Sequence, residues 1–235
     1  MRLALARRFA ELAVPFPVVG ADILVQSTQE VYKRLRGEPL ILMFCGGKDS
    51  IVMLDIAMGI KLPNLKIVHG YFCLDIPSRE KFLAYYDGKY GIKIERRLSW
   101  YGSSMKEGRT IKQAELYNEL RKEFHIPYIA EGIKPTDSII RNALIKQSDK
   151  GIDTKVLKCY PLYRWYDSAV MAYIKQNKLM LPVEYQAGVK HDLSNMTVES
   201  LQWIKHNLPA DYEVIINNYP KLKERMIHKE LYGEQ

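Results

Sequence analysis

The residues best suited to chemistry in this chain form one short segment, Cys45-Gly46-Gly47-Lys48-Asp49-Ser50. Two adjacent glycines let the backbone bend tightly and turn its N–H groups toward a ligand, with no side chain in the way. Lys48 adds a mobile positive charge, and Ser50 adds a hydroxyl donor. A helix that begins here would add its positive N-terminal end, so the segment predicts a site for phosphate or pyrophosphate.

Two residues of the segment have alternative interpretations. Asp49 is a poor phosphate ligand by itself, but its carboxylate suits a bound Mg²⁺ or a helix cap. Cys45 borders an electropositive loop, although the simpler interpretation is a small residue that fills the first loop position. The whole segment could also be an ordinary strand-to-helix turn. We favour an anion site because glycines, lysine, hydroxyl and helix end coincide.

The spacing excludes two common nucleotide-binding motifs. A Walker P-loop needs G-x-x-x-x-G-K-[ST], but Leu42 stands five residues before Gly47, and Asp49 follows Lys48. The Rossmann dinucleotide fingerprint needs G-x-G-x-x-G, which the chain lacks.

Strand and helix patterns alternate around the segment. Short apolar or β-branched runs predict strands at 40–44, 66–74, 91–98, 127–131 and 154–159. Helical patterns occupy 21–36, 50–59, 78–86, 110–124, 138–146, 167–177 and 198–208. Ser78 predicts the cap of one helix, and Thr110 with Gln113 predicts a capping box at another. Alternating strands and helices indicate right-handed crossovers and a parallel sheet.

We therefore predict an α/β fold with a doubly wound, mostly parallel sheet of about five strands and helices on both faces. A chain of 235 residues is most simply one domain. We place its core at about 38–182 and a helical C-terminal extension at 183–235.

Composition limits the partners. The formal charge of +8 favours an anion, whether a nucleotide, a nucleic acid or a membrane surface. No apolar run is long enough to span a bilayer, and the segment 1–8 is too short for a secretory signal, so we predict a cytoplasmic protein without a membrane partner. The three cysteines lie far apart, which argues against a disulfide scaffold and against an iron–sulfur cluster.

Four segments resemble a known family. The loop is similar to the S-G-G-x-D-S PP-loop, with Cys45 in place of the first serine, and Asp75 resembles that family's acidic strand end. Residues 131–141 are similar to G-x-R-x-x-E-S-x-x-R, with Lys134 in place of arginine, and residues 160–174 resemble P-L-x-x-W-x-x-x-D-V-x-x-Y-I. The chain is identified as a member of the phosphoadenosine phosphosulfate (PAPS) reductase family of PP-loop adenine nucleotide α-hydrolases, which includes the ATP sulfurylase small subunit and FAD synthetases.

The resemblance implies a nucleotide site. Asp75 would orient the ribose or, with Asp49, hold Mg²⁺, although a turn-forming Asp needs no function. Lys134 and Arg141 are separated by about two helical turns, so both could face one anionic group, the alternative being a solvated basic face. The implied nucleotide-binding residues are Cys45, Gly46, Gly47, Lys48, Asp49, Ser50, Asp75, Gly132, Lys134, Asp137 and Arg141, and the implied catalytic residues are Lys48, Ser50 and Arg141. His69 and Trp165 are predicted to be core residues.

Three functions follow from the resemblance. The first is cleavage of ATP between its α and β phosphates, with Mg²⁺ and with adenylyl transfer to an unknown acceptor. The second is reduction of PAPS or adenylyl sulfate, but the family's C-terminal E-C-G-[IL]-H cysteine is missing, because no cysteine follows Cys159. The third is a non-catalytic nucleotide-binding accessory of a nucleic-acid-processing system, suggested by Lys221, Lys223, Arg225 and Lys229. A protein partner and a homo-oligomer stay open.

Overall fold

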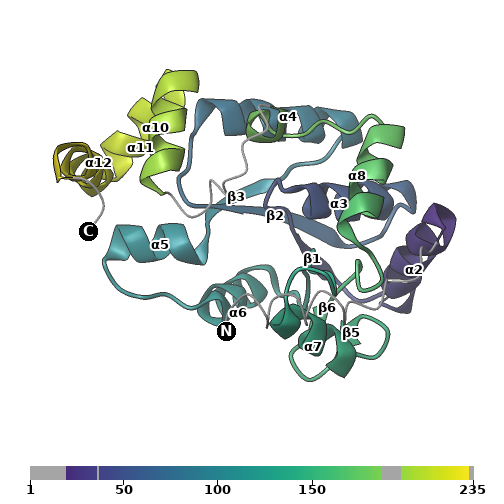
Figure 1. Cartoon of the computed structure of the whole chain (residues 1–235). Coiled ribbons are helices and arrows are strands. Elements are labelled where there is room, and N and C mark those ends of the chain that lie inside the picture. The colour runs from purple at the N-terminus through teal and green to yellow at the C-terminus, as the bar shows by residue number, and fades with distance from the viewer. Residues whose placement is uncertain (1–19, 36, 187–196, 233–235) are drawn as a thin grey trace, which may run out of the picture.

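A computed structural model describes residues 20–35, 37–186 and 197–232 (Figure 1). The predicted helix end at residue 36 and the segment 1–8 lie outside the described residues. The elements are α2 (Ala21–Arg34), β1 (Leu40–Met43), α3 (Lys48–Gly59), β2 (Leu65–Tyr71), α4 (Pro77–Tyr90), β3 (Glu95–Leu98), α5 (Trp100–Glu107), α6 (Gln113–Phe124), β4 (Tyr128–Ala130), α7 (Ile139–Gln147), β5 (Ile152–Asp153), β6 (Lys158–Cys159), α8 (Asp167–Gln176), α9 (Val183–Gln186), α10 (Val198–Asn207), α11 (Pro209–Asn218) and α12 (Pro220–Tyr232).

Within the described residues, the sheet has six strands in the order β3-β2-β1-β4-β6-β5. Neighbouring strands are parallel except for β5 and β6. β2 and β3 lie on one side of β1, whereas β4 and the later strands lie on the other side. The strand order therefore reverses between β1 and β4, and open α/β sheets bind ligands at the carboxyl ends of strands beside such a reversal.

Helices cover both faces of the sheet, as predicted (Figure 1). Successive side chains of a strand point to opposite faces. Leu40 and Leu42 of β1 accordingly pack into a cluster with α2, α3, α4 and α8. Ile41, between them, packs with Leu116 and Leu120 of α6 on the other face. The doubly wound α/β architecture is thus confirmed.

One predicted strand is a hairpin instead. The segment predicted as a single strand at 154–159 contains the turn between β5 and β6. The Asp153 carboxylate accepts hydrogen bonds from the backbone N–H groups of Lys155 and Val156, and this Asx-type turn reverses the chain. The sheet therefore gains one short antiparallel strand beyond the expected five.

Both predicted helix caps are wrong. Helix α6 begins at Gln113 with Lys112 as its N-cap, and the Gln113 side chain donates to Tyr117 and Glu131 instead of bonding back toward Thr110. Helix α4 begins at Pro77 and has no side-chain cap. Ser78 instead donates its backbone N–H and its hydroxyl to Asp211 of α11. Tertiary partners have taken over both side chains, which a local pattern cannot anticipate.

The C-terminal helices form the predicted helical region, at the opposite end of the molecule from α2 (Figure 1). Their apolar residues, among them Leu201, Ile204 and Ile215, cluster with Tyr71 and Phe72 at the end of β2. Residues 198–232 contain five Lys or Arg and five Asp or Glu, so their formal charge is zero. Lys221, Lys223, Arg225 and Lys229 are therefore balanced by carboxylates of the same region, and the excess of positive charge lies in the rest of the chain. None of the described helices is long and apolar enough to cross a membrane.

A close contact between Gly102 of α5 and Phe72, the residue after β2, allows a prediction about stability. Helix α5 was not predicted; it begins after Ser99, whose hydroxyl accepts the backbone N–H of Gly102. A Cβ on Gly102 would overlap the backbone of Phe72, 2.8 Å from its carbonyl carbon and from its Cα. We expect Gly102→Ala to lower the free energy of unfolding by about 1–3 kcal/mol in urea titrations. Gly88→Ala is the control, since a Cβ there meets nothing within 4 Å and should stabilise α4 by about 0.5–1 kcal/mol. Equal effects would refute the steric argument.

Candidate active site

The loop between β1 and α3 makes the tight glycine turn that the sequence predicts. Gly46 has a φ of +79°, in the left-handed region that favours glycine. Gly47 is the N-cap of α3, which begins at Lys48. The Ser50 hydroxyl donates to the Gly47 carbonyl at 2.8 Å, and the Cys45 thiol lies 3.5 Å from the Ser50 oxygen. Ser50 is buried, and its hydroxyl holds the loop against the start of α3, at the carboxyl end of the interior strand β1.

Lysines and aspartates form an ion-pair cluster beside this loop. Lys48 Nζ lies 3.1 Å from Asp49 Oδ2 and 2.9 Å from Asp167 Oδ1. Lys134 Nζ lies 3.1 Å from Asp49 Oδ1 and 3.3 Å from Asp167 Oδ1, and also pairs with Asp137. Only 1% of the Lys134 side chain is exposed, against 61% of Asp167. Lys134 is therefore the buried centre of the cluster.

These ion pairs shift the pKa values of Lys48 and Asp167. Burial alone would lower the pKa of Lys48, but Asp49 and Asp167 raise that pKa above its ordinary value. Burial alone would raise the pKa of Asp167, but Lys48 and Lys134 hold it below its ordinary value. Lys48 and Asp167 are therefore both charged at neutral pH, which stabilises their ion pair.

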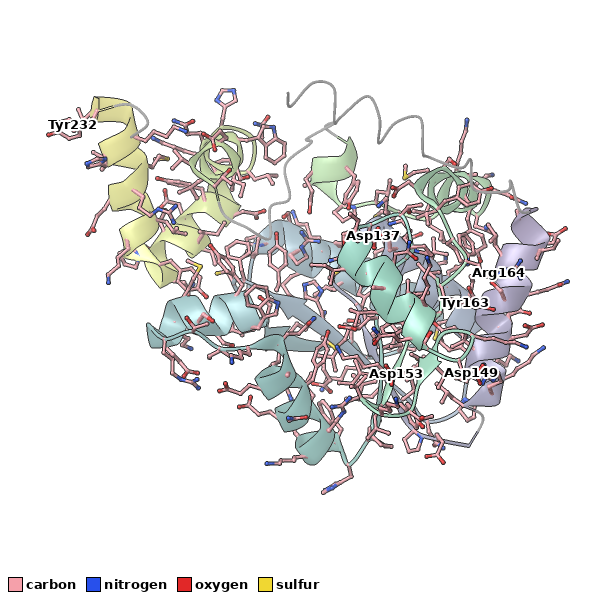
Figure 2. All side chains as sticks on the ribbon, turned by 60° about the horizontal axis from the view of Figure 1, so that its bottom comes forward. Asp137, Asp149, Asp153, Tyr163, Arg164 and Tyr232 are labelled. Atoms are coloured by element: carbon pink, nitrogen blue, oxygen red, sulfur yellow. The ribbon has the colours of Figure 1, made fainter. Side chains whose placement is uncertain are left out.

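Lys134 and Arg141 meet one anionic group, but it is the protein's own Asp137. Arg141 Nη1 lies 3.2 Å from Asp137 Oδ2, and the Asp137 carboxylate also accepts the backbone N–H of Lys134. The predicted helical spacing is wrong, because Lys134 precedes α7 and is followed by Pro135, which disfavours helical geometry at the residue before it. Figure 2 shows Asp137 beside the N-terminal end of α7, just before its N-cap Ser138. Arg141 is half exposed and available to a ligand.

Two predicted site residues remain, Gly132 and Asp75. Gly132 packs against the start of α3, since a Cβ there would lie 3.4 Å from Asp49 and 3.3 Å from Met53. Asp75 is exposed and has a φ of +58°. Burial and the nearby Asp75 raise the pKa of Cys73 to about 11. Across the described residues, no group of three or more His, Cys, Asp or Glu side chains could hold a metal ion by itself.

Sequence reasoning missed residues from α4 and α9 that contact the loop. Arg79 Nη1 lies 2.6 Å from the position of a Cβ on Gly46, and its Nη2 lies 2.5 Å from Glu184 Oε1. The Tyr185 hydroxyl lies 3.6 Å from the position of a Cβ on Gly47. Arg79 lies four residues after Asp75, so its closeness in sequence to a candidate site residue could have marked it. The four-residue helix α9 is too short for any periodicity to predict.

His69 is a buried core residue, as predicted. Its Nδ1 donates to the Phe44 carbonyl at 2.6 Å, and its ring stacks on Tyr71, while Nε2 has no partner among the described residues. Burial, together with the charges of Arg79 and Arg96, lowers the pKa of His69 from 6.5 to about 3. The folded protein therefore holds this imidazole neutral.

The buried histidine predicts a loss of stability in mild acid. Because the folded pKa is depressed, the unfolded chain takes up the proton first, and stability is lost as the pH falls from 6.5 toward 3. We expect the free energy of unfolding to drop by about 2 kcal/mol more in the wild type than in His69→Asn between about pH 7.5 and pH 5. Urea titrations at both pH values test this. Parallel curves for the two proteins would contradict it.

The family follows from the match along the sequence. A family model described as phosphoadenosine phosphosulfate reductase domain matches residues 39–191, more than half of the chain. The chain belongs to the phosphoadenosine phosphosulfate reductase domain family. The match to this PAPS reductase domain begins just before β1 and contains the loop and the whole ion-pair cluster. No curated protein matches the chain.

Solved structures support the same fold. PAPS reductase from Candida auris, in a phosphate complex, has a TM-score of 0.51 and 18% identity, over 73% of this chain and 92% of that chain. NH3-dependent NAD synthetase from Campylobacter jejuni, in complex with nitrate, has a TM-score of 0.51 and 10% identity, over 93% of this chain and 98% of that chain. At these identities the likeness shows the PP-loop fold of the PAPS reductase domain and nothing finer.

Proposed function

We propose that the chain binds ATP or a related adenine nucleotide at the loop 45–50 and cleaves ATP between its α and β phosphates. The observation that carries this proposal is the double-glycine loop at the start of α3, beside the reversal of strand order, with Lys48, Lys134 and Arg141 around it. A helix N-terminus with adjacent cations is a site for phosphates. The phosphate and nitrate held by the two structural relatives are consistent with an anion site on this fold.

The proposed reaction is adenylyl transfer. A nucleophilic atom of the acceptor attacks the α-phosphorus, the bond from that phosphorus to the bridging oxygen breaks, and pyrophosphate leaves with the electron pair, while the acceptor proton goes to solvent. The loop N–H groups and Lys48 would stabilise the charge on the leaving pyrophosphate. Arg141 would contact the α-phosphate, since its guanidinium is exposed and can bind two oxygens at once. Such catalysis depends on positioning and on charge.

The donor set at Asp49 fits a magnesium ion. Asp49 Oδ1 is buried and accepts no hydrogen bond among the described residues, and its charge is balanced by Lys134 Nζ at 3.1 Å, so a bound ion would displace that ion pair. Proteins commonly hold Mg²⁺ with one or two carboxylates and the substrate phosphates. Asp49 would therefore hold the ion, with Asp75 as the second candidate. The ion would neutralise phosphate charge during transfer.

Calorimetric titration with ATP and Mg²⁺, with pyrophosphate assayed on the same samples, tests the proposal. ATP binding with pyrophosphate release in the presence of an acceptor supports adenylyl transfer. Release of γ-phosphate alone, or absence of ATP binding by intact protein, would overturn it. Binding without any product would favour a nucleotide-binding accessory protein.

Cys45 favours a second candidate, reduction of a sulfonucleotide such as PAPS. Cys45 is the first residue of the loop and is exposed, whereas Cys73 and Cys159 are buried. Burial raises the pKa of both buried thiols. In this reaction the Cys45 sulfur would attack the sulfo group, release the nucleotide and form an S-sulfonate, from which an added dithiol releases sulfite. Sulfite production from PAPS that disappears in Cys45→Ser would establish this candidate.

A further inference from the structure

Arg79 is a buried cation that the chemistry above does not use. Only 8% of its side chain is exposed, and burying a guanidinium is costly unless it is paired. Its partners are the Glu184 carboxylate, at 2.5 Å, and the ring of Tyr71, whose centroid lies 4.3 Å from the guanidinium carbon. Glu184 and Tyr71 belong to different elements, so the guanidinium is held at a fixed place.

The guanidinium lies beside the loop 45–50. Arg79 Nη1 lies 2.6 Å from the position that a Cβ on Gly46 would occupy. The guanidinium therefore packs directly against the backbone of the loop, where any residue larger than glycine would overlap it. A guanidinium offers five N–H donors, and one carboxylate cannot use them all. An anion bound by the loop N–H groups would therefore lie within reach of Arg79 as well as Lys48.

Oxygen atoms of the protein already bind the groups that a phosphate would use. The Glu184 carboxylate pairs with Arg79, and the Asp167 carboxylate pairs with Lys48 Nζ. The Tyr185 hydroxyl lies beside the loop, 3.6 Å from the position of a Cβ on Gly47. Glu184 and Tyr185 are neighbours in α9, so one short helix places two oxygen-bearing side chains at the loop. A bound phosphate could replace them with its own oxygens.

We infer that Arg79 is a second cationic ligand for the phosphates of the bound nucleotide, and that Glu184 competes with those phosphates for its guanidinium. The inference rests on the proposed nucleotide site and adds a residue to it. It differs from a purely structural role, in which the Arg79–Glu184 pair only anchors α9. The two roles make opposite predictions for Glu184.

Titration calorimetry with ATP and with inorganic pyrophosphate tests this inference on the full chain. We expect Arg79→Gln to weaken the binding of both by at least about tenfold, because a charge-assisted contact to phosphate is lost. Glu184→Gln should strengthen both by about threefold or more, because the competing charge is removed. The double variant should bind no better than Arg79→Gln. The matched control is Arg34→Gln, which removes an exposed Arg–Asp pair with Asp149 and should change neither affinity.

The outcomes separate the two proposals. A gain of affinity in Glu184→Gln cannot come from misfolding, so it supports the inference even where Arg79→Gln is unstable. Unchanged or weaker binding in Glu184→Gln, with normal dependence on Lys48, would overturn the role of Arg79 and leave the nucleotide site intact. A wild-type protein that binds neither ATP nor pyrophosphate would overturn the proposed function, and this inference with it.

Discussion

Lys48→Ala is expected to weaken ATP binding by at least about tenfold and, if both phosphates contact the ammonium, by about a hundredfold. Lys48 stands at the first residue of α3, where its charge adds to the helix end and to the loop N–H groups. Titration calorimetry with ATP and Mg²⁺ measures the change. Pyrophosphate release should fall in parallel, because the same charge would stabilise the leaving group.

A matched lysine provides the control. Lys66 pairs with Glu95 at 2.8 Å, and its side chain is partly exposed like that of Lys48, but it lies on β2 and belongs to a different ion pair. Lys66→Ala should leave ATP affinity unchanged. If Lys48→Ala binds ATP as tightly as the wild type, the loop is not the nucleotide site.

The second large effect concerns stability. Lys134→Met should lower the free energy of unfolding by about 3–5 kcal/mol at neutral pH, because it leaves three carboxylates with only two cations, Lys48 and Arg141, around a buried position. The carboxylates in question are those of Asp49, Asp137 and Asp167. Urea titration measures the loss. Lys134→Arg keeps the charge, so we expect it to lose clearly less.

The pH dependence distinguishes lost charge from lost packing. In the wild type the lowered pKa of Asp167 stabilises the fold above its unfolded pKa, and this contribution is lost as the pH falls through the folded pKa. In Lys134→Met the carboxylates repel one another, so protonation relieves the variant. The difference between wild type and variant should therefore shrink toward about pH 4. A difference that is constant with pH would mean that Lys134 acts through packing alone.

The central strand and the loop after it could be predicted from the sequence. Residues 40–44 are all apolar because β1 is buried on both faces, and two glycines then stop the strand. The start of α3 and the backbone conformation of the loop follow from residues adjacent in sequence. Local chemistry determines such features, so a pattern in the sequence reveals them.

The partners of the site could not be predicted in the same way. Lys48 was expected to be open to a ligand, yet the structure pairs it with Asp167 of α8. Arg79 and Glu184 meet only because α4 and α9 are brought together by the fold. Ion pairs between distant segments carry no periodic signal, and a charged residue that neutralises another looks like any surface charge until the fold is known.

Helix α2 precedes the residues shared with the family, yet it supports both sides of the site. The Tyr32 hydroxyl donates to the Met53 carbonyl of α3, and the Thr28 hydroxyl donates to the Pro161 carbonyl. Trp165, two residues before Asp167, donates its indole N–H to Thr28. A fragment trimmed to residues 39–191 would leave these partners without bonds and would uncover the apolar residues that α2 protects. The inherited signature of the family is therefore shorter than the piece of chain that must fold for the site to exist.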